Sequence, residues 1–343
     1  MRMRPHVALA CMGLLCAAVT GGAFGQGQPS AEVPLAGQEV RAWLVRIHEA
    51  ANRRNFQGTF VVTGGGVVSS ARIAHFCEGP SQYQRSESLD GQARHVFRHN
   101  DNVTTIWPGA RIAVVEQRSS TSQFPALLQA GDDGVADFYD VRLGGTERIA
   151  GHDARLLLVR PRDAYRYGYR LWADQASGLL LRADVIGERN DVLESSAFSD
   201  VAIGVKPQPE SVLQPMRRLE GYRVLRPVLE STQLEAEGWG LRRAVPGFRE
   251  VSCVKRPLDG NGVPDSEAAA QRVVQAIFSD GLTYVSVFIE PFDSKRHARP
   301  MTTAVGPTQT LMIRHGDWWV TMLGDVPPMT LRAFASALER GKR

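Results

Sequence analysis

Apolar residues recur at two different spacings in the first 120 residues. Val40, Trp43, Leu44, Ile47 and Ala51 follow the spacing of one helix face, so the pattern predicts an amphipathic helix. From about residue 59 onward apolar and polar residues alternate, which is typical of half-buried strands. We therefore expect strands over residues 59–63, 67–76, 92–99, 103–107 and 111–117, with Gly64-Gly65-Gly66 as a hairpin tip.

The clearest strand pattern lies between residues 147 and 203. Short apolar runs are separated there by turn residues, which predicts an antiparallel meander with strands over residues 147–150, 154–159, 165–172, 179–186 and 193–203. In the third run the period of two places Tyr165, Tyr167, Tyr169 and Leu171 on one face and Arg166, Arg170 and Trp172 on the other. The less regular stretch before the meander predicts two short helices, over residues 124–129 and 135–139.

The last third of the chain has its own pattern. Residues 206–222 carry three prolines and no clean period, which predicts a linker. Beyond it we expect a strand over residues 248–254, two hairpins over residues 272–289 and 308–323, and a helix that starts at Pro327-Pro328. The fold class is therefore α+β: a large curved antiparallel sheet with an N-terminal helix over residues 30–205, and a smaller α+β domain over residues 223–343.

The N-terminus has the composition of an export signal. Arg2 and Arg4 precede a 14-residue apolar run, and Ala23-Phe24-Gly25 fits a cleavage site, so residues 1–25 are predicted to be a secretory signal peptide. Its removal takes away two arginines and lowers the formal charge from +4 to about +2. We expect a soluble protein in an exported compartment, where Cys77 and Cys253 are either bridged or, as we favour, separate thiols.

The sequence holds few patterns that indicate catalysis. His95 and His99 alternate within a predicted strand and lack a third ligand at useful spacing, so no metal or other cofactor is expected. No nucleophile or phosphate-loop motif is present, and we expect no enzymatic activity, with an exported hydrolase kept as the weaker alternative. Arginine clusters such as Arg160, Arg162, Arg166 and Arg170 are read as solvated faces, or else as a patch for an anionic partner. Nucleic acid is excluded as a partner because the protein is exported.

Several segments, taken in order, resemble the RseB/MucB family of periplasmic regulators. The resemblance rests on residues 83–94, 137–140 followed by 151–154, 167–174 and 178–182, and in the last third on residues 246–252, 256–258, 278–282 and 324–328. It spans nearly all of the mature chain. The chain departs from the family at Cys77, at the triple glycine, and at Thr104-Thr105, where many relatives carry a cysteine.

The resemblance implies a function that the residues alone do not. Such proteins bind the periplasmic part of a transmembrane anti-sigma factor and shield it from site-1 proteolysis, until a lipid, lipopolysaccharide or lipoprotein signal releases them. The domain over residues 30–205 is similar to lipoprotein carriers with half-barrel sheets, and the domain over residues 223–343 is implied to contact the anti-sigma factor. The implied location is the periplasm, and a homo-oligomer is compatible with this picture. A periplasmic carrier of lipids or lipoproteins is the alternative.

Two sets of residues are the candidates for these roles. Ligand-lining candidates are apolar or aromatic residues in predicted strands: Phe60, Val62, Ile73, Ile106, Trp107, Leu171 and Trp172. For each of them ordinary core packing is the competing interpretation. Partner-contact candidates are Phe288, Trp318 and Trp319, together with Arg85 and Arg94 from the family segment. Trp318 and Trp319 are adjacent in a strand and must point to opposite faces, so one is expected in the core and the other at a contact surface.

Overall fold

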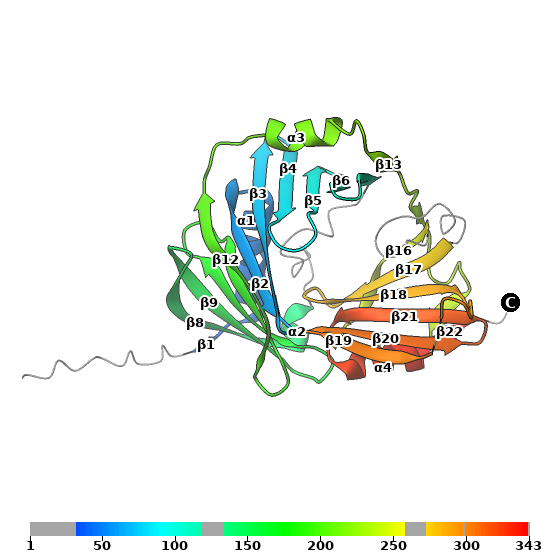
Figure 1. Ribbon diagram of the computed structural model, residues 1–343. Helices are drawn as coiled ribbons and strands as arrows, with labels where there is room; N and C mark the ends of the chain where they lie inside the picture. The colour runs from blue at the N-terminus through cyan, green and yellow to red at the C-terminus, as the bar shows by residue number, and fades with distance from the viewer. Residues whose placement is uncertain (1–31, 118–133, 258–271, 298, 342–343) are drawn as a thin grey trace, which may run out of the picture. The chain divides into compact units, whose positions relative to one another are not determined.

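The computed structural model describes residues 32–117, 134–257, 272–297 and 299–341. These residues form two large, mostly antiparallel sheets, one two-stranded sheet and four helices. The expected α+β class, with one large open sheet and a second smaller unit, is confirmed (Figure 1). Within the described ranges no helix is long and apolar enough to cross a membrane. The predicted helix over residues 124–129 lies outside them.

The first sheet begins with the predicted amphipathic helix beside it. Helix α1 (Gly37–Arg53) starts where the Glu39 carboxylate accepts the Ala36 backbone N–H at 2.9 Å. Its buried residues include Val40 and Ile47, and it packs against two strands of this sheet, β3 and β11. The thirteen described strands run in the spatial order β1 (Val33–Pro34), β8 (Tyr139–Ile149), β9 (His152–Pro161), β10 (Gly168–Asp174), β11 (Leu180–Ile186), β12 (Val192–Ile203), β2 (Phe56–Gly64), β3 (Val67–Glu78), β4 (Ser81–Ser88), β5 (His95–His99), β6 (Asn102–Trp107), β7 (Ile112–Gln117) and β13 (Arg223–Leu225).

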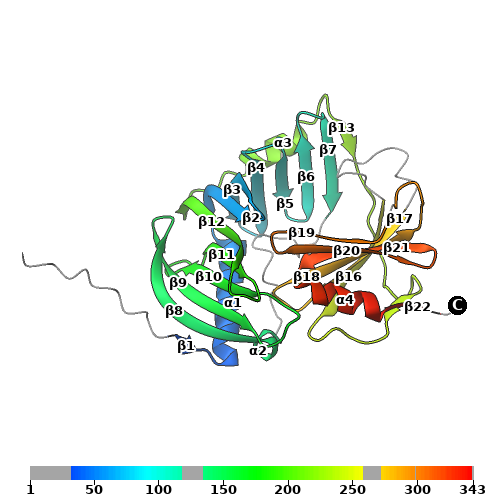
Figure 2. The ribbon, with the colours of Figure 1, turned by 60° about the horizontal axis from the view of Figure 1, so that its bottom comes forward.

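The turns of this sheet follow the predicted chemistry. Gly65 and Gly66 form the two-residue turn between β2 and β3 with φ of 58° and 78°, a backbone conformation that glycine adopts without strain. The strand directions change markedly from β8 to β7, as expected for a large twisted sheet (Figure 2). The short helix α2 (Val135–Phe138) precedes β8, as predicted.

The predicted linker is more structured than its prolines indicate. Residues 210–217 form helix α3 (Glu210–Arg217), which packs on β4 and β5 (Figure 1). Val212 is fully buried there, and Leu213 and Met216 pack beside it against Phe76 and Phe97. β13 then pairs in parallel with β7 through Arg223↔Ile112 to Leu225↔Val114. The chain therefore adds a helix and a strand to the first sheet before it enters the second.

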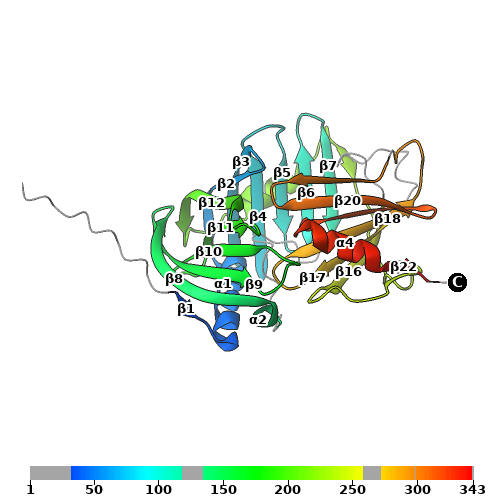
Figure 3. The same cartoon turned by 90° about the horizontal axis from the view of Figure 1, so that it is seen from below.

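The second sheet contains the predicted hairpins. Its seven described strands run in the order β14 (Glu230–Ser231), β16 (Arg249–Pro257), β17 (Arg272–Ser279), β18 (Tyr284–Pro291), β21 (Trp318–Asp325), β20 (Thr308–His315) and β19 (Met301–Val305). Helix α4 (Pro328–Ala337) follows Pro327 and packs against β20 and β21 (Figure 3). β15 (Trp239–Leu241) and β22 (Leu338–Arg340) pair as a separate two-stranded sheet. The core lies between α4 and the sheet, where Phe334 contacts Phe248 and Phe278.

Candidate functional site

Four of the seven ligand-lining candidates meet in one apolar cluster of the first sheet. This phenylalanine cluster is built around Phe56, Phe60, Trp172, Leu181 and Phe198, with Val62 and Ile73 packed against it. Phe60 lies opposite Phe198 in the β2–β12 ladder, and their rings meet edge to face at 5.1 Å. Phe60 and Trp172 are buried, whereas Val62 and Ile73 are half-buried. The cluster is therefore a packed core with an accessible margin at Val62 and Ile73.

The other three candidates lie elsewhere. Leu171 is adjacent to Trp172 in β10 and so points to the opposite face, where it packs in the cluster that contains Val40 and Ile47 of α1. Ile106 packs in the cluster under α3, and Trp107 is half-buried at the end of β6. Of the seven candidates, Phe60, Ile106, Leu171 and Trp172 are buried and the other three are half-buried, and the period of two could not tell which of them share a neighbourhood.

A cavity of about 310 Å³ borders the phenylalanine cluster. It is lined by the last two turns of α1 and by the turn after β10, through Arg46, Glu49, Ala50, Arg53, Arg54, Ala176 and Ser177. Ala50 belongs both to the lining of this basic cavity and to the phenylalanine cluster. Three arginines and one glutamate give this lining a net positive charge, which favours an anionic ligand, although the Arg46 guanidinium also donates to the Gln175 carbonyl. None of these residues was predicted as a site residue, although Arg46 and Arg53 are seven residues apart and therefore lie on one helix face.

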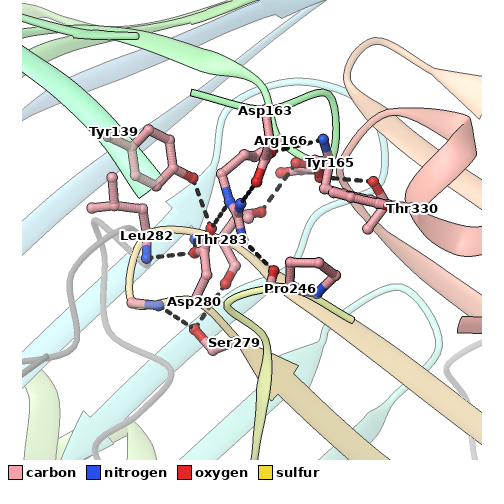
Figure 4. Close-up of polar contacts among 12 residues, drawn as sticks. Tyr139, Asp163, Tyr165, Arg166, Pro246, Ser279, Asp280, Leu282, Thr283 and Thr330 are labelled. Atoms are coloured by element: carbon pink, nitrogen blue, oxygen red, sulfur yellow. Dashed lines mark hydrogen bonds and ion pairs between the residues drawn. The ribbon is translucent and has the colours of Figure 1, made fainter. Parts of the chain in front are cut away.

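A second polar group, here called the Arg166 cluster, lies deep in the protein (Figure 4). It consists of Arg166, Asp163, Asp280, Tyr139 and Pro246. The side chains of Arg166 and Asp280 are both 0% exposed, and Arg166 Nε donates to Asp280 Oδ2 at 2.8 Å. The guanidinium also pairs with Asp163 and donates to the Pro246 carbonyl at 2.6 Å. The expectation that Arg166 lies on a solvated strand face is therefore wrong, because residues 165–167 precede β10 and carry this side chain inward.

Asp280 is held from several sides. Tyr139 donates its hydroxyl to Asp280 Oδ2 at 2.8 Å, and the backbone N–H groups of Leu282 and Thr283 donate to Oδ1 at 2.9 Å each. Burial and the nearby Asp280 carboxylate raise the pKa of Tyr139 well above its usual value, so this hydroxyl stays protonated. Nearby, Thr330 of α4 donates to the Tyr165 carbonyl at 2.7 Å. The Arg166 cluster thus connects residues of the first sheet with residues of the second.

The partner-contact candidates lie in two parts of the fold: Arg85 and Arg94 belong to the first sheet and its loops, whereas Phe288, Trp318 and Trp319 belong to the second sheet. Arg85, in β4, is half-buried, and within the described residues its Nε has no hydrogen-bond partner, whereas Arg94 is exposed before β5. Phe288 is half-buried in β18. Trp318 and Trp319 begin β21. Trp319 is 5% exposed and stacks on His297, with 4.8 Å between the ring centroids. Trp318 is half-buried against Trp239 and Arg340. Intramolecular neighbours therefore cover most of both indoles.

Cys77 and Cys253 are separate thiols, as favoured from the sequence. Cys253 is buried in the core of the second sheet, and burial raises the pKa of its thiol to about 12. Burial also raises the pKa of Cys77, which accordingly remains a thiol near neutral pH. Cys77 contacts the Asn52 carbonyl at 3.0 Å and packs beside His75.

Comparison with known proteins identifies the family. Residues 39–216 match the MucB/RseB N-terminal domain, and residues 233–339 match the MucB/RseB C-terminal domain. The sigma factor AlgU regulatory protein MucB of Pseudomonas aeruginosa is 29% identical over 301 residues, which cover 86% of this chain and 89% of that protein. The sigma-E factor regulatory protein RseB of Escherichia coli is 24% identical over 301 residues, which cover 88% and 90%.

Solved structures agree with this assignment. A complex structure of Pseudomonas aeruginosa MucA/MucB matches with a TM-score of 0.67 at 26% identity, covering 89% of this chain and 100% of that one. A crystal structure of MucB in complex with MucA(peri) matches with a TM-score of 0.64 at 26% identity, covering 88% and 99%. Both domain models thus match in order on a fold shared with MucB, and the chain belongs to the MucB/RseB family.

Proposed function

We propose that this protein is a non-catalytic periplasmic regulator that binds the periplasmic part of a transmembrane anti-sigma factor and shields it from site-1 proteolysis. The observation that carries the proposal is the match of both family domains, in order, to relatives named as sigma factor regulators and to MucB solved with MucA. Cleavage of residues 1–25 would place the protein in the same compartment as such a partner. The domain over residues 223–343 is proposed to supply most of the contact, through surfaces near Phe288 and Trp318.

The binding step is tested with purified mature protein, beginning at Gln26, and the periplasmic segment of the anti-sigma factor from the same bacterium. We expect saturable one-to-one binding with a Kd of about 10 μM or tighter, as suits a signal that must be released. Calorimetry measures the affinity, and a site-1 protease digest measures the protection. A segment of scrambled sequence serves as the control, and absence of binding at about 100 μM would overturn the proposal.

The release signal is proposed to be an amphiphile with an anionic head group that binds the first sheet. The accessible margin of the phenylalanine cluster at Val62 and Ile73 offers apolar contacts, and the basic cavity beyond Ala50 offers guanidinium groups. Such a ligand shifts the partner equilibrium only if it binds the partner-free state more tightly than the bound state. A lipid carrier is the second candidate function, but a carrier of this kind has no need of the second sheet.

Reversing two charges of the basic cavity tests the release signal. Anionic vesicles are expected to dissociate the preformed complex, and Arg53→Glu/Arg54→Glu is expected to raise the required lipid concentration at least about fivefold, because the cavity loses its positive charge. Arg148→Glu/Arg189→Glu makes the same change in net charge and serves as the control, because Arg148 in β8 and Arg189 in the β11–β12 turn are both exposed and do not line the cavity. Equal behaviour of the two double variants, or no dissociation by vesicles, contradicts this assignment. Transfer of acylated cargo without binding of the anti-sigma segment would favour the carrier.

A further inference from the structure

The strand β19 is an edge strand of the second sheet (Figure 2). Its five residues, Met301–Val305, pair with β20 alone among the described strands, and all five are exposed. The strand contains no charge and no proline, the two devices that usually blunt an edge. The other described edges of the two large sheets differ: β1, β13 and β14 have two or three residues, and each carries a proline or a charged side chain.

An edge of this kind can accept another strand. In an antiparallel ladder every second residue of the outer strand points its N–H and C=O away from its neighbour, so β19 offers such groups on its outer side. Five residues extend over roughly 17 Å, which is enough for a short added strand. Met301 and Val305, one at each end, are among the exposed large apolar side chains of the described chain. Hydrogen bonds between the backbones of β19 and the added strand would supply the affinity, and contacts between their side chains would fix the register of the added strand.

The two ends of β19 have different chemistry. Lys295 and Arg299, in the segment that leads into β19, are both exposed. At the other end the β19–β20 turn lies against the β2–β3 hairpin, where a β-carbon on Gly65 would come within 2.7 Å of the Gly306 nitrogen. Three exposed valines belong to the strands that meet at this junction: Val67, Val68 and Val192. The surface is therefore basic at one end and rich in valine at the other.

We propose that β19 binds an extended segment of the anti-sigma factor as an added strand. The segment would place an acidic residue beside Lys295 and Arg299 and apolar β-branched residues beside Val305 and its neighbours. This inference rests on the proposed function and assigns it a binding surface. A second copy of the chain fits less well, because two-fold pairing of β19 with itself is antiparallel and would set the basic end of one copy against the valine-rich end of the other.

Two valines with almost equal exposure provide a matched test. Val305 on β19 is 67% exposed, with its Cγ1 beside Gly65, and Val228, before β14, is 68% exposed, so the ammonium group of a lysine at either position can reach solvent in the free protein. Val305→Lys is expected to weaken binding of the anti-sigma segment at least about tenfold, because the lysine would have to be desolvated beneath the added strand. Val228→Lys is expected to change the affinity less than about twofold. Amide hydrogen exchange at residues 301–305 is expected to slow in the complex.

The outcomes separate the two proposals. If wild-type protein does not bind the segment at all, the proposed function fails and this inference fails with it. If wild-type protein binds but Val305→Lys binds equally well and exchange at residues 301–305 is unchanged, β19 is not the docking strand although the function stands. Slower exchange that depends on protein concentration without any partner would instead show that β19 pairs with a second copy, which also overturns the inference.

Discussion

Replacing Asp280 with alanine is expected to lower the free energy of unfolding by about 3–5 kcal/mol, because the substitution breaks a fully buried ion pair. Arg166 would keep Asp163 and the Pro246 carbonyl but lose the carboxylate at 2.8 Å. The Tyr139 hydroxyl and the N–H groups of Leu282 and Thr283 would also lose their acceptor. Urea unfolding followed by tryptophan fluorescence measures the change.

An exposed ion pair supplies the control for this measurement. Glu32 accepts a hydrogen bond from Arg160 at 2.8 Å, and both side chains are substantially exposed, so Glu32→Ala is expected to cost less than about 1 kcal/mol. Asp280→Asn keeps the size of the side chain and an acceptor for the two N–H groups. Its loss in free energy of unfolding should therefore lie between the losses for Glu32→Ala and Asp280→Ala. A loss below about 1 kcal/mol for Asp280→Ala would show that the Arg166 cluster does not stabilise the fold.

Truncating Phe60 to alanine is expected to cost about 3–5 kcal/mol, because the ring fills the phenylalanine cluster and the cavity left behind collapses only in part. The ring is buried, and its centroid lies 5.1 Å from the centroid of the Phe198 ring. The same urea titration measures the loss. The result decides between the two interpretations of this residue, core packing and ligand lining.

Val62 is the natural comparison for Phe60. It lies two residues further along β2, points to the same face and is half-buried, so Val62→Ala is expected to cost only about 1 kcal/mol. If Phe60→Ala left stability within about 1 kcal/mol of wild type but weakened lipid binding, Phe60 would line a ligand site rather than fill the core. Both variants should therefore be titrated with the same lipid vesicles.

The turn chemistry and the period of two predicted most of the fold. The triple glycine, the meander and both late hairpins were identified because each strand has one apolar face and ends at turn residues. β4 was not predicted, because Ser81–Ser88 is polar on both faces and only Tyr83 is buried, so pairing with β3 and β5 alone makes it a strand. Helix α3 was missed because Pro207, Pro209 and Pro215 concealed a short apolar face at Val212 and Met216.

The candidate sites were harder to predict than the strands. Alternation placed Leu171 and Trp172 on opposite faces of one strand, as the structure has them, but it does not tell which face borders a ligand, and so both were kept as lining candidates. Arg166 and Asp280 are 114 residues apart, and no local pattern links them. The family resemblance supplied the function, whereas the basic cavity and the β19 edge became visible only when distant segments were placed side by side.

The parallel pairing of β13 with β7 determines how the protein can be dissected. A truncated chain that stops at residue 205 would lose both α3 and β13, leaving Phe76 and Phe97 uncovered and the outer groups of β7 unpaired. Such a fragment is prone to aggregate for reasons unrelated to its ligand. Expression of the first half alone should therefore extend through Leu225, and that fragment, which lacks Asp280, would still leave the buried Arg166 without its fully buried ion-pair partner.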